Sequence, residues 1–245
     1  MAISTNPLAW LRSVQPRRAI ALLLLLLPLT VGAQTVRDLW LSMPPSLAPY
    51  LSTSLRTQCL DFYDMHTDAQ TDNALKGKSR IDTLTSTFLA ATLSKAHTLQ
   101  MKLLPASGSG SASASGSASG LGSSMVSGSS SSLSSCDSVL CVVRSWDGPK
   151  RDSEVQLFDR QWKPLQAPLT FSADSFVCRP DTMSEERFSR LVAMLDPIMF
   201  SVSLSPAENV LLVKLSPVVP NPEDEKAIEQ ILVQRKLKWD GKTFK

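Results

Sequence analysis

The sequence predicts an α+β fold in which helices pack on an antiparallel sheet built from meanders and hairpins. Two observations lead to this class. Short stretches in which apolar and polar residues alternate recur beside turn residues, as is typical of antiparallel strands. Apolar residues at helical spacing occur in blocks between groups of strands and do not follow each strand, so the chain lacks the βαβ rhythm of a parallel sheet.

The chain is organised around the stretch 182–217, which reads as a helix followed by a hairpin. Its second half has an earlier echo in 88–105, because both contain Leu-Ser-x-Ala, a turn and then Lys-Leu-x-Pro. We expect these hairpins to build the sheet, and an internal helix–hairpin repeat is one interpretation of the echo.

The first 33 residues have the anatomy of a secretory signal peptide. Three arginines precede an apolar run with six consecutive leucines, and small residues follow, which predicts cleavage between Ala33 and Gln34. The apolar run is shorter than the roughly 20 residues that span a bilayer. We therefore expect a periplasmic or secreted protein that has no transmembrane segment after signal cleavage.

Cleavage also changes the charge of the protein. The precursor has a formal net charge of +3, and residues 1–33 contain three arginines and no acidic residue, so the mature chain is neutral. A nucleic-acid-binding protein normally carries a basic patch, and the mature chain shows none. We expect no nucleic-acid partner.

Residues 106–135 are almost entirely Ser, Gly and Ala. A segment of this low complexity cannot bury enough apolar surface to offset its ordering entropy, which predicts a disordered region. It either tethers two domains or is a long insertion in one domain. We favour a single α+β domain over 34–245 that is interrupted by this insertion, because 34–105 holds little sheet and loop-closure entropy grows slowly with length.

Two helices are expected before the sheet. The first covers 36–43, where apolar residues recur at helical spacing until Pro44. The second is expected to be capped by Thr53 or Ser54 and to run through Met65.

Five strands are expected in the middle of the chain. The stretch 79–105 predicts three short strands, and the last of them alternates Leu99 and Met101 with polar residues, as a half-buried strand does. The apolar run 139–143 suits a central strand, and 154–159 returns after an Asp-Gly turn.

The C-terminal part is expected to contain two helices around the hairpin. Thr182 and Glu185 have the spacing of a capping box for the first of them. Asn221 is expected to cap the second, and Asp240-Gly241 is a hairpin-turn signal near the end of the chain.

Five stretches form a recognisable set: MPPSLAPYL, LQMKLLP, CVVRSWDGP, ERFSRLVAMLDPIMFSVSLSP and LKWDGKTFK. Together they resemble an uncharacterised family of exported Bacteroidetes proteins, the domain of unknown function 3256. The resemblance covers nearly all of the mature chain except the Ser/Gly tract, which looks like an enlarged connection. It implies an exported single-domain protein without an assigned activity, and it transfers no functional residue.

No catalytic motif is found. The sequence has no G-x-S-x-G, no H-E-x-x-H, no phosphate-cradling glycine loop and no C-x-x-C. A triad assembled from distant residues stays open, but nothing in the sequence points to one, and no cofactor is expected.

A metal site is not expected either. His66 and His97 have no second histidine at ligand spacing and are interpreted as solvated surface residues. Four acidic residues would share a face if their helix continued, but the glycine-containing loop of an EF-hand is missing, so a solvated acidic face is favoured. They are Asp61, Asp64, Asp68 and Asp72.

The four cysteines divide into two kinds. Cys59 and Cys141 lie within apolar patterns and suit buried free thiols. Cys136 and Cys178 are the more plausible disulfide pair, since an exported protein meets an oxidising compartment.

Three Asp-Ser/Thr-apolar triplets match the O-glycosylation sequon of Bacteroidetes, a hypothesis that depends on the family resemblance. The candidate acceptors are Thr83, Ser138 and Thr182. Ser138 beside the Ser/Gly tract is preferred, because Thr182 is also the expected helix cap.

Three tryptophans stand next to turns. Trp146 and Trp239 precede Asp-Gly, and Trp162 precedes Lys-Pro. We favour the interpretation that they close the edges of the core. The alternative is a binding face, since Trp is favoured at interface hot spots.

These observations favour a non-enzymatic binding or interaction module of the cell envelope. Its partner would be a protein or a glycan, bound through the sheet face or the hairpin tips, although this rests on analogy at the level of the fold. The alternative is a small-ligand-binding protein or a hydrolase-type enzyme with a site between sheet and helices.

Overall fold

The computed structural model describes residues 34–106, 138–219 and 221–245 and confirms the α+β class. The predicted signal peptide lies outside the described residues, as does the Ser/Gly/Ala tract beyond Ala106. Residues Gln34–Lys245 form one compact unit.

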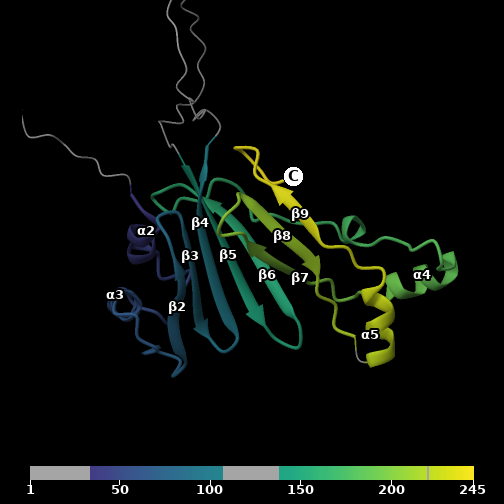
Figure 1. Ribbon diagram of the computed structural model, residues 1–245, viewed down its shortest axis with the longest axis horizontal. Helices are drawn as coiled ribbons and strands as arrows, with labels where there is room; N and C mark the ends of the chain where they lie inside the picture. Colours follow the sequence, from purple (N-terminus) through teal and green to yellow (C-terminus); the bar gives the residue numbers. More distant parts are fainter. Residues whose placement is uncertain (1–33, 107–137, 220) are drawn as a thin grey trace, which may run out of the picture. The chain divides into compact units, whose positions relative to one another are not determined.

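The elements follow one another as shown in Figure 1. The helices are α2 (Val36–Ser42), α3 (Thr53–Asp64), the 3-10 turn η2 (Ala173–Phe176), α4 (Glu185–Ala193) and α5 (Pro222–Glu229). The strands are β1 (Thr71–Asp72), β2 (Lys78–Leu84), β3 (Phe88–Ser94), β4 (His97–Pro105), β5 (Ser138–Asp147), β6 (Arg151–Phe158), β7 (Phe200–Leu204), β8 (Val210–Leu215) and β9 (Arg235–Lys238).

The strands form two sheets, which corrects the expectation of a single one. β1 to β6 make a six-stranded meander in chain order, and β7 to β9 make a separate three-stranded sheet. All neighbouring strands are antiparallel. Short turns impose this arrangement on the consecutive strands β1 to β4, on β5 with β6 and on β7 with β8, because a tight connection reverses the chain.

The two hairpins that echo each other in sequence lie in different sheets. β3 and β4 belong to the meander, and β7 and β8 belong to the three-stranded sheet. α4 precedes β7, whereas β2 precedes β3. The structure therefore does not establish a helix–hairpin repeat.

The Ser/Gly/Ala tract connects two neighbouring strands of the same sheet. β4 and β5 pair without interruption from His97↔Trp146 to Pro105↔Ser138. The chain leaves the described residues after Ala106 and returns at Ser138, so both ends of the tract stand side by side at one end of the sheet.

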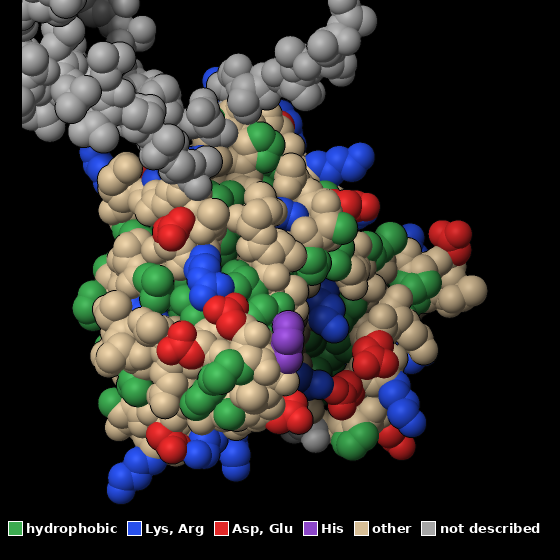
Figure 2. All heavy atoms as spheres, turned by 60° about the vertical axis from the view of Figure 1, so that its left-hand side comes forward, with side chains coloured by type: hydrophobic (Ala, Val, Ile, Leu, Met, Phe, Trp, Pro, Cys, Tyr) green, Lys and Arg blue, Asp and Glu red, His purple; other side chains and the backbone are tan. Residues whose placement is uncertain are grey.

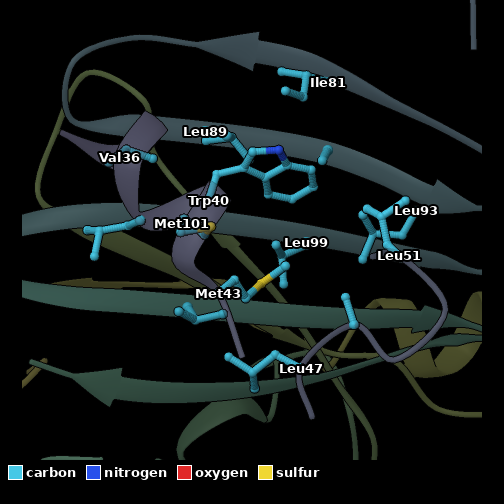
Figure 3. Packing of buried hydrophobic residues seen from close by; sticks show 14 of the residues in the cluster. Val36, Trp40, Met43, Leu47, Leu51, Ile81, Leu89, Leu93, Leu99 and Met101 are labelled. Atoms are coloured by element: carbon cyan, nitrogen blue, oxygen red, sulfur yellow. The ribbon is translucent and has the colours of Figure 1, made fainter. Parts of the chain in front are cut away.

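Helices α2 and α3 cover one face of the six-stranded sheet. Figure 3 shows the side chain of Trp40 on α2 directed at the sheet, where Leu89 and Met101 are its labelled neighbours. Trp40 is fully buried, and its Nε1 donates to the carbonyl of Arg56 on α3 at 3.0 Å. This bond satisfies the polar atom of a large buried aromatic, so the tryptophan anchors both helices on the sheet.

The opposite face of the same sheet is also covered. Val139, Cys141 and Val143 of β5 pack with Val202 and other residues of the three-stranded sheet, whereas the alternate residues of β5 face α2 and α3. The central strands are therefore buried on both faces, which explains why β5 reads as a continuous apolar run. The prediction that β4 is half-buried was wrong, because its polar residues face the second sheet.

Polar side chains of the large sheet cap the outer edge of β7. The backbone N–H groups of Val202 and Leu204 donate to Ser153 Oγ at 3.1 Å and to Gln100 Oε1 at 2.8 Å. The N–H of Phe200 donates to Asp152 Oδ1 at 3.3 Å. An unpaired strand edge buried against another layer would be unfavourable, and these acceptors remove that cost.

Lys102 of β4 fixes the turn that joins β7 to β8. The residue is 2% exposed, and its Nζ donates to the carbonyls of Ser205, Pro206 and Glu208 at 2.6, 3.0 and 2.8 Å. Burial lowers the pKa of Lys102, which the nearby Cys141 and Glu208 oppose. Three carbonyl acceptors use all three ammonium protons and so stabilise a charge that is otherwise costly to bury.

Two helix caps differ from the sequence prediction. α4 is capped by Ser184, whose hydroxyl accepts from the N–H of Arg187 at 3.3 Å, and not by Thr182. α3 is capped by Ser52 and not by Thr53 or Ser54. In both places several hydroxyl residues stand together, and the one that adopts extended backbone directly before the helix becomes the cap. The cap of α5 by Asn221 follows the prediction.

Replacing Lys102 by Met is expected to lower the free energy of unfolding by about 2–4 kcal/mol, because three turn carbonyls lose their common donor. Urea denaturation measures the change. Lys214→Met on β8 is the matched control, since Lys214 is exposed, and it is expected to change stability by less than about 0.5 kcal/mol. Equal effects of the two variants would contradict the role of Lys102.

Ser184→Ala is expected to cost about 1 kcal/mol of unfolding free energy through loss of the α4 cap. Thr182→Ala removes a hydroxyl two residues away that caps nothing and is expected to be nearly neutral. Denaturation curves of both variants compare the two assignments, and a larger loss for Thr182→Ala would restore the capping box of the sequence prediction.

Candidate functional site

Trp146 is the most exposed of the three tryptophans that the sequence singled out. It lies near the end of β5, before the turn to β6, and is 39% exposed. Its cross-strand neighbour is His97 at the start of β4. The two rings are stacked, with centroids 5.2 Å apart and planes at 9°. Cross-strand pairing thus brings together two aromatic residues that are 49 positions apart in the chain.

Arg144 lies two residues before Trp146 and on the same face of β5. Its guanidinium carbon stands 5.4 Å from the centroid of the Trp146 ring, within cation–π distance. The same guanidinium donates to Glu154 of β6 at 2.6 Å. The carboxylate holds the cation in place against the indole.

Tyr50, from the segment between α2 and α3, completes the group. Its hydroxyl is hydrogen-bonded to Nδ1 of His97, and the two rings meet edge to face at 5.8 Å. We call Tyr50, His97, Arg144 and Trp146 the Trp146 cluster. The prediction that His97 is a solvated surface residue was wrong, because it is 7% exposed beneath its two aromatic neighbours.

Burial sets the ionisation of this cluster. It lowers the pKa of His97 to about 4, and the nearby Arg144 lowers it further. Burial also raises the pKa of Tyr50 to about 12, against the effect of Arg144. Near neutral pH the imidazole and the phenol are therefore both uncharged. Nε2 of His97 is buried and has no hydrogen-bond partner among the described residues.

The chemistry of the cluster suits recognition. A protonated phenol does not act as a base, and the Arg144 cation is already paired with a carboxylate. What the cluster offers is a large aromatic side chain that is partly exposed and held on two sides by fixed groups. Trp and Arg in such pre-organised positions are the residues that dominate binding at interfaces.

The other two tryptophans close the core. Trp162 is 9% exposed, donates from Nε1 to Ser42 Oγ at 3.3 Å and packs edge to face on Phe158. Trp239 is half-buried, donates to the carbonyl of Pro105 at 2.6 Å and contacts Phe244. Of the three predicted binding-face aromatics, only Trp146 is an exposed residue.

The candidate glycosylation sites differ in accessibility. Ser138 is 8% exposed and its hydroxyl accepts from Arg160 Nε at 3.0 Å, so the residue preferred from the sequence is the least accessible. Thr83 is half-buried on β2, and Thr182 is exposed. The cap at Ser184 leaves the hydroxyl of Thr182 without that role, which favours Thr182 as an acceptor. Glycosylation itself stays a prediction.

The three described cysteines differ in burial in the way that the sequence predicted. Cys59 and Cys141 are buried and unpaired, and Cys178 is exposed. Burial raises the pKa of the Cys141 thiol, which keeps it protonated and inert. Cys136 lies outside the described residues, so its disulfide with Cys178 stays a prediction, as does the cleavage between Ala33 and Gln34.

The acidic residues near α3 do not form a common face. The helix ends at Asp64, which pairs with Arg37, and Asp72 pairs with Lys78 at 2.6 Å. His66 follows the helix end with a left-handed backbone, φ 52°. In the part of the chain that the structure describes, no three His, Cys, Asp or Glu side chains converge as a metal site requires.

The cavities among the described residues include one beside α5 and one beside α3. One of about 320 Å³ stands between α5 and the end of β8, with Leu215 and Ile228 in its wall and the Lys150–Glu225 ion pair at its side. The other, of about 450 Å³, lies between α3 and β2 and is lined by Cys59, His66 and other residues. Neither includes a residue of the Trp146 cluster.

Sequence reasoning found Trp146 but missed its partners. Tyr50 and Arg144 occur in ordinary helical and strand patterns, and His97 was assigned to solvent. The β4–β5 register is the signal that joins them, and it becomes visible only when the strands are paired.

The described residues contain no helix with the length and hydropathy needed to cross a bilayer.

Replacing His97 by Phe is expected to weaken the pH dependence of stability. The folded-state pKa of His97 lies below its unfolded value, so the unfolded state binds the proton first and stability is lost as pH falls from about 6.5 to about 4. Between pH 7.5 and 4.5 this amounts to roughly 2–3 kcal/mol. Denaturation curves at both pH values measure the loss of unfolding free energy on acidification. This loss is expected to be smaller by that amount in the Phe variant than in the unmodified protein. Equal losses would contradict the lowered pKa of His97.

Comparisons with known proteins give a fold and a family. A family model described as "Protein of unknown function (DUF3256)" matches residues 28–113 and 129–244, and the gap falls within the Ser/Gly/Ala tract. A solved domain of an uncharacterized protein from Porphyromonas gingivalis W83 is similar over 87% of this chain and 99% of its own, with a TM-score of 0.61 and 22% identity. No curated protein matches. The chain belongs to the DUF3256 family of proteins of unknown function.

Proposed function

We propose that this protein is an exported, non-enzymatic binding module of the cell envelope that contacts a macromolecular partner through the Trp146 end of its large sheet. The signal-peptide pattern of residues 1–33 supports export. The observation that carries the binding role is the partly exposed indole of Trp146, fixed by His97 and Arg144.

Strand addition at a sheet edge is a less favourable way to bind a partner here. β1 covers only the first two residues of β2, and beyond that pairing the N–H of Leu84 on β2 donates to the hydroxyl of Tyr63 at 3.1 Å. Residues Leu165 and Leu169 bond to the backbone of β6, and side chains cap β7. Because these edges already have partners, a docking strand would find few free backbone groups.

The surface charge does not favour a general electrostatic partner. Figure 2 shows acidic, basic and hydrophobic side chains interspersed over the face that it draws, without a broad area of one sign. Specific contacts at a few fixed side chains are then the better source of affinity.

A small-ligand or enzymatic function is the second candidate, and the cavity of about 320 Å³ beside α5 supports it. Its apolar wall and charged border are of the kind that holds a small amphipathic molecule. A ligand that raises the melting temperature and loses this effect in Ile228→Trp, which fills the cavity, would favour this candidate.

The binding proposal is tested by crosslinking the full-length protein in the cells that export it and recovering it from the envelope fraction. Trp146→Ser is expected to lower the yield of the crosslinked partner at least tenfold, as loss of a tryptophan hot spot does. Leu165→Ser is the matched control, because Leu165 is 44% exposed and lies away from this end of the sheet. Recovery of the uncrosslinked protein alone would refute the proposal.

A further inference from the structure

The surface around Trp146 continues to a second exposed apolar side chain, Leu75. Leu75 lies in the turn between β1 and β2 and is 68% exposed, the largest value among the large hydrophobic residues of the described chain. A leucine so exposed on a turn makes no contribution to the core. Its position near the Trp146 cluster makes it a candidate contact residue for a partner.

The turn that carries Leu75 is rigid. Its buried residue Asn73 accepts through Oδ1 from the N–H groups of Leu75 and Gly77, each at 3.0 Å. The Nδ2 atom of Asn73 donates to Ser79 Oγ at 3.0 Å and to the carbonyl of Leu93 at 2.8 Å. With all these bonds made inside the protein, the amide locks the turn and holds Leu75 outward at little entropic cost on binding.

A chain of contacts links this turn to the Trp146 cluster. The N–H of Ala74, next to Leu75, donates to the carbonyl of Tyr50 at 3.0 Å. The hydroxyl of Tyr50 bonds to His97, which stacks on Trp146. Three strand intervals separate β2 from β5, so these strands lie about 15 Å apart across the sheet, and Leu75 lies on the turn that precedes β2. Both fit within one interface of roughly 800 Å² per partner.

Two of the charged side chains in the described turns at this end form no ion pair, and both are lysines. The turns after β1, β3 and β5, together with the strand residues at their ends, carry seven charged residues, and Asp72 among them is paired with Lys78. Asp147 and Lys150 are paired with Arg151 and Glu225. Lys76 and Lys95 are exposed and form no ion pair within the residues that the structure describes. Asp152, the cross-strand neighbour of Trp146 on β6, is an exposed carboxylate that accepts from the N–H of Phe200 at 3.3 Å, so it places one negative charge near the two lysines.

We propose that Leu75, Lys76, Lys95 and the Trp146 cluster form one docking surface for a protein segment that carries apolar residues flanked by Asp or Glu. This inference rests on the proposed binding function and names its partner class. The two apolar anchors supply the affinity, and the two lysines select an acidic partner and exclude a basic one.

A protein segment fits this surface better than a membrane. Electrostatic binding to anionic lipid needs a cluster of about four to eight Lys or Arg residues, and the turns offer two unpaired lysines. A segment of about ten helical residues or five strand residues spans the roughly 15 Å between the strands beside the two anchors.

The test places the photoreactive residue benzoylphenylalanine, which is itself large and apolar, at position 75, 146 or 165 of the full-length protein in the exporting cells. Positions 75 and 146 are expected to crosslink to the same partner, and position 165 is expected to give no such adduct. Peptide mapping is expected to place the crosslinks within one segment rich in Asp or Glu.

Two further variants test the second anchor and the charge, both read at the position 146 crosslink. Leu75→Ser is expected to lower the adduct yield about tenfold. The double variant Lys76→Glu with Lys95→Glu is expected to lower it by a similar factor, and Lys76→Arg with Lys95→Arg is expected to retain it. All these side chains are exposed, so folding is not at risk.

The outcomes separate this inference from the proposed function. An adduct from position 146 alone, unaffected by the Leu75 and lysine variants, would leave the binding function standing and overturn the extended surface. An adduct of lipid mass, or a mapped segment without acidic residues, would overturn the partner class. Absence of any adduct from 75 and 146, or equal adducts from 165, would overturn both.

Discussion

The three-stranded sheet depends on the contact between Lys102 and the β7–β8 turn. A buried ammonium needs acceptors on all sides, and the carbonyls of Ser205, Pro206 and Glu208 provide them. These acceptors exist only when the turn stands over β4. The Lys102 ammonium therefore fixes the position of the small sheet on the large one. Any displacement of the small sheet would leave this buried cation without hydrogen-bond acceptors. The acceptors that cap β7 enforce the same alignment from its edge.

Covering both faces of the meander has a consequence for the rest of the surface. α2 and α3 occupy one face and the second sheet occupies the other, while side chains and flanking segments occupy the strand edges. What remains accessible is mainly the two ends of the strands. One end leads to the Ser/Gly/Ala tract after Pro105, and the other carries the turns with Leu75 and Trp146. Burial of the sheet thus leaves its turns as the most accessible part of the meander.

The Trp146 cluster combines stability with exposure in one place. His97 is buried and stacks on Trp146. Because the imidazole is uncharged near neutral pH, its burial beside the Arg144 cation causes no charge repulsion. Glu154 binds the guanidinium that would otherwise repel a protonated imidazole more strongly. Each member needs the others, and only the indole is left facing solvent. Such an arrangement limits the motion of Trp146, so the proposed binding of a partner would carry a smaller ordering cost.

The sequence by itself determined the α+β class, most of the strands, the helices and the position of Trp146 beside a turn. Local patterns sufficed for these, since apolar periodicity and turn residues act over a few positions. The sequence could not show that there are two sheets, because the polar residues of β4 read as a solvent face until a second layer covers them. Nor could it choose Ser184 over Thr182 as the helix cap.

Tertiary structure alone decided where the chemistry lies. Tyr50, His97 and Trp146 meet because β4 and β5 pair across the long tract and the α2–α3 segment folds over them. Contacts with Ser42 and Phe158 bury Trp162, whereas Trp146 stays exposed, although both precede turns. Contacts between residues far apart in the chain arise from strand register and layer packing, and neither is encoded in any local window of the sequence.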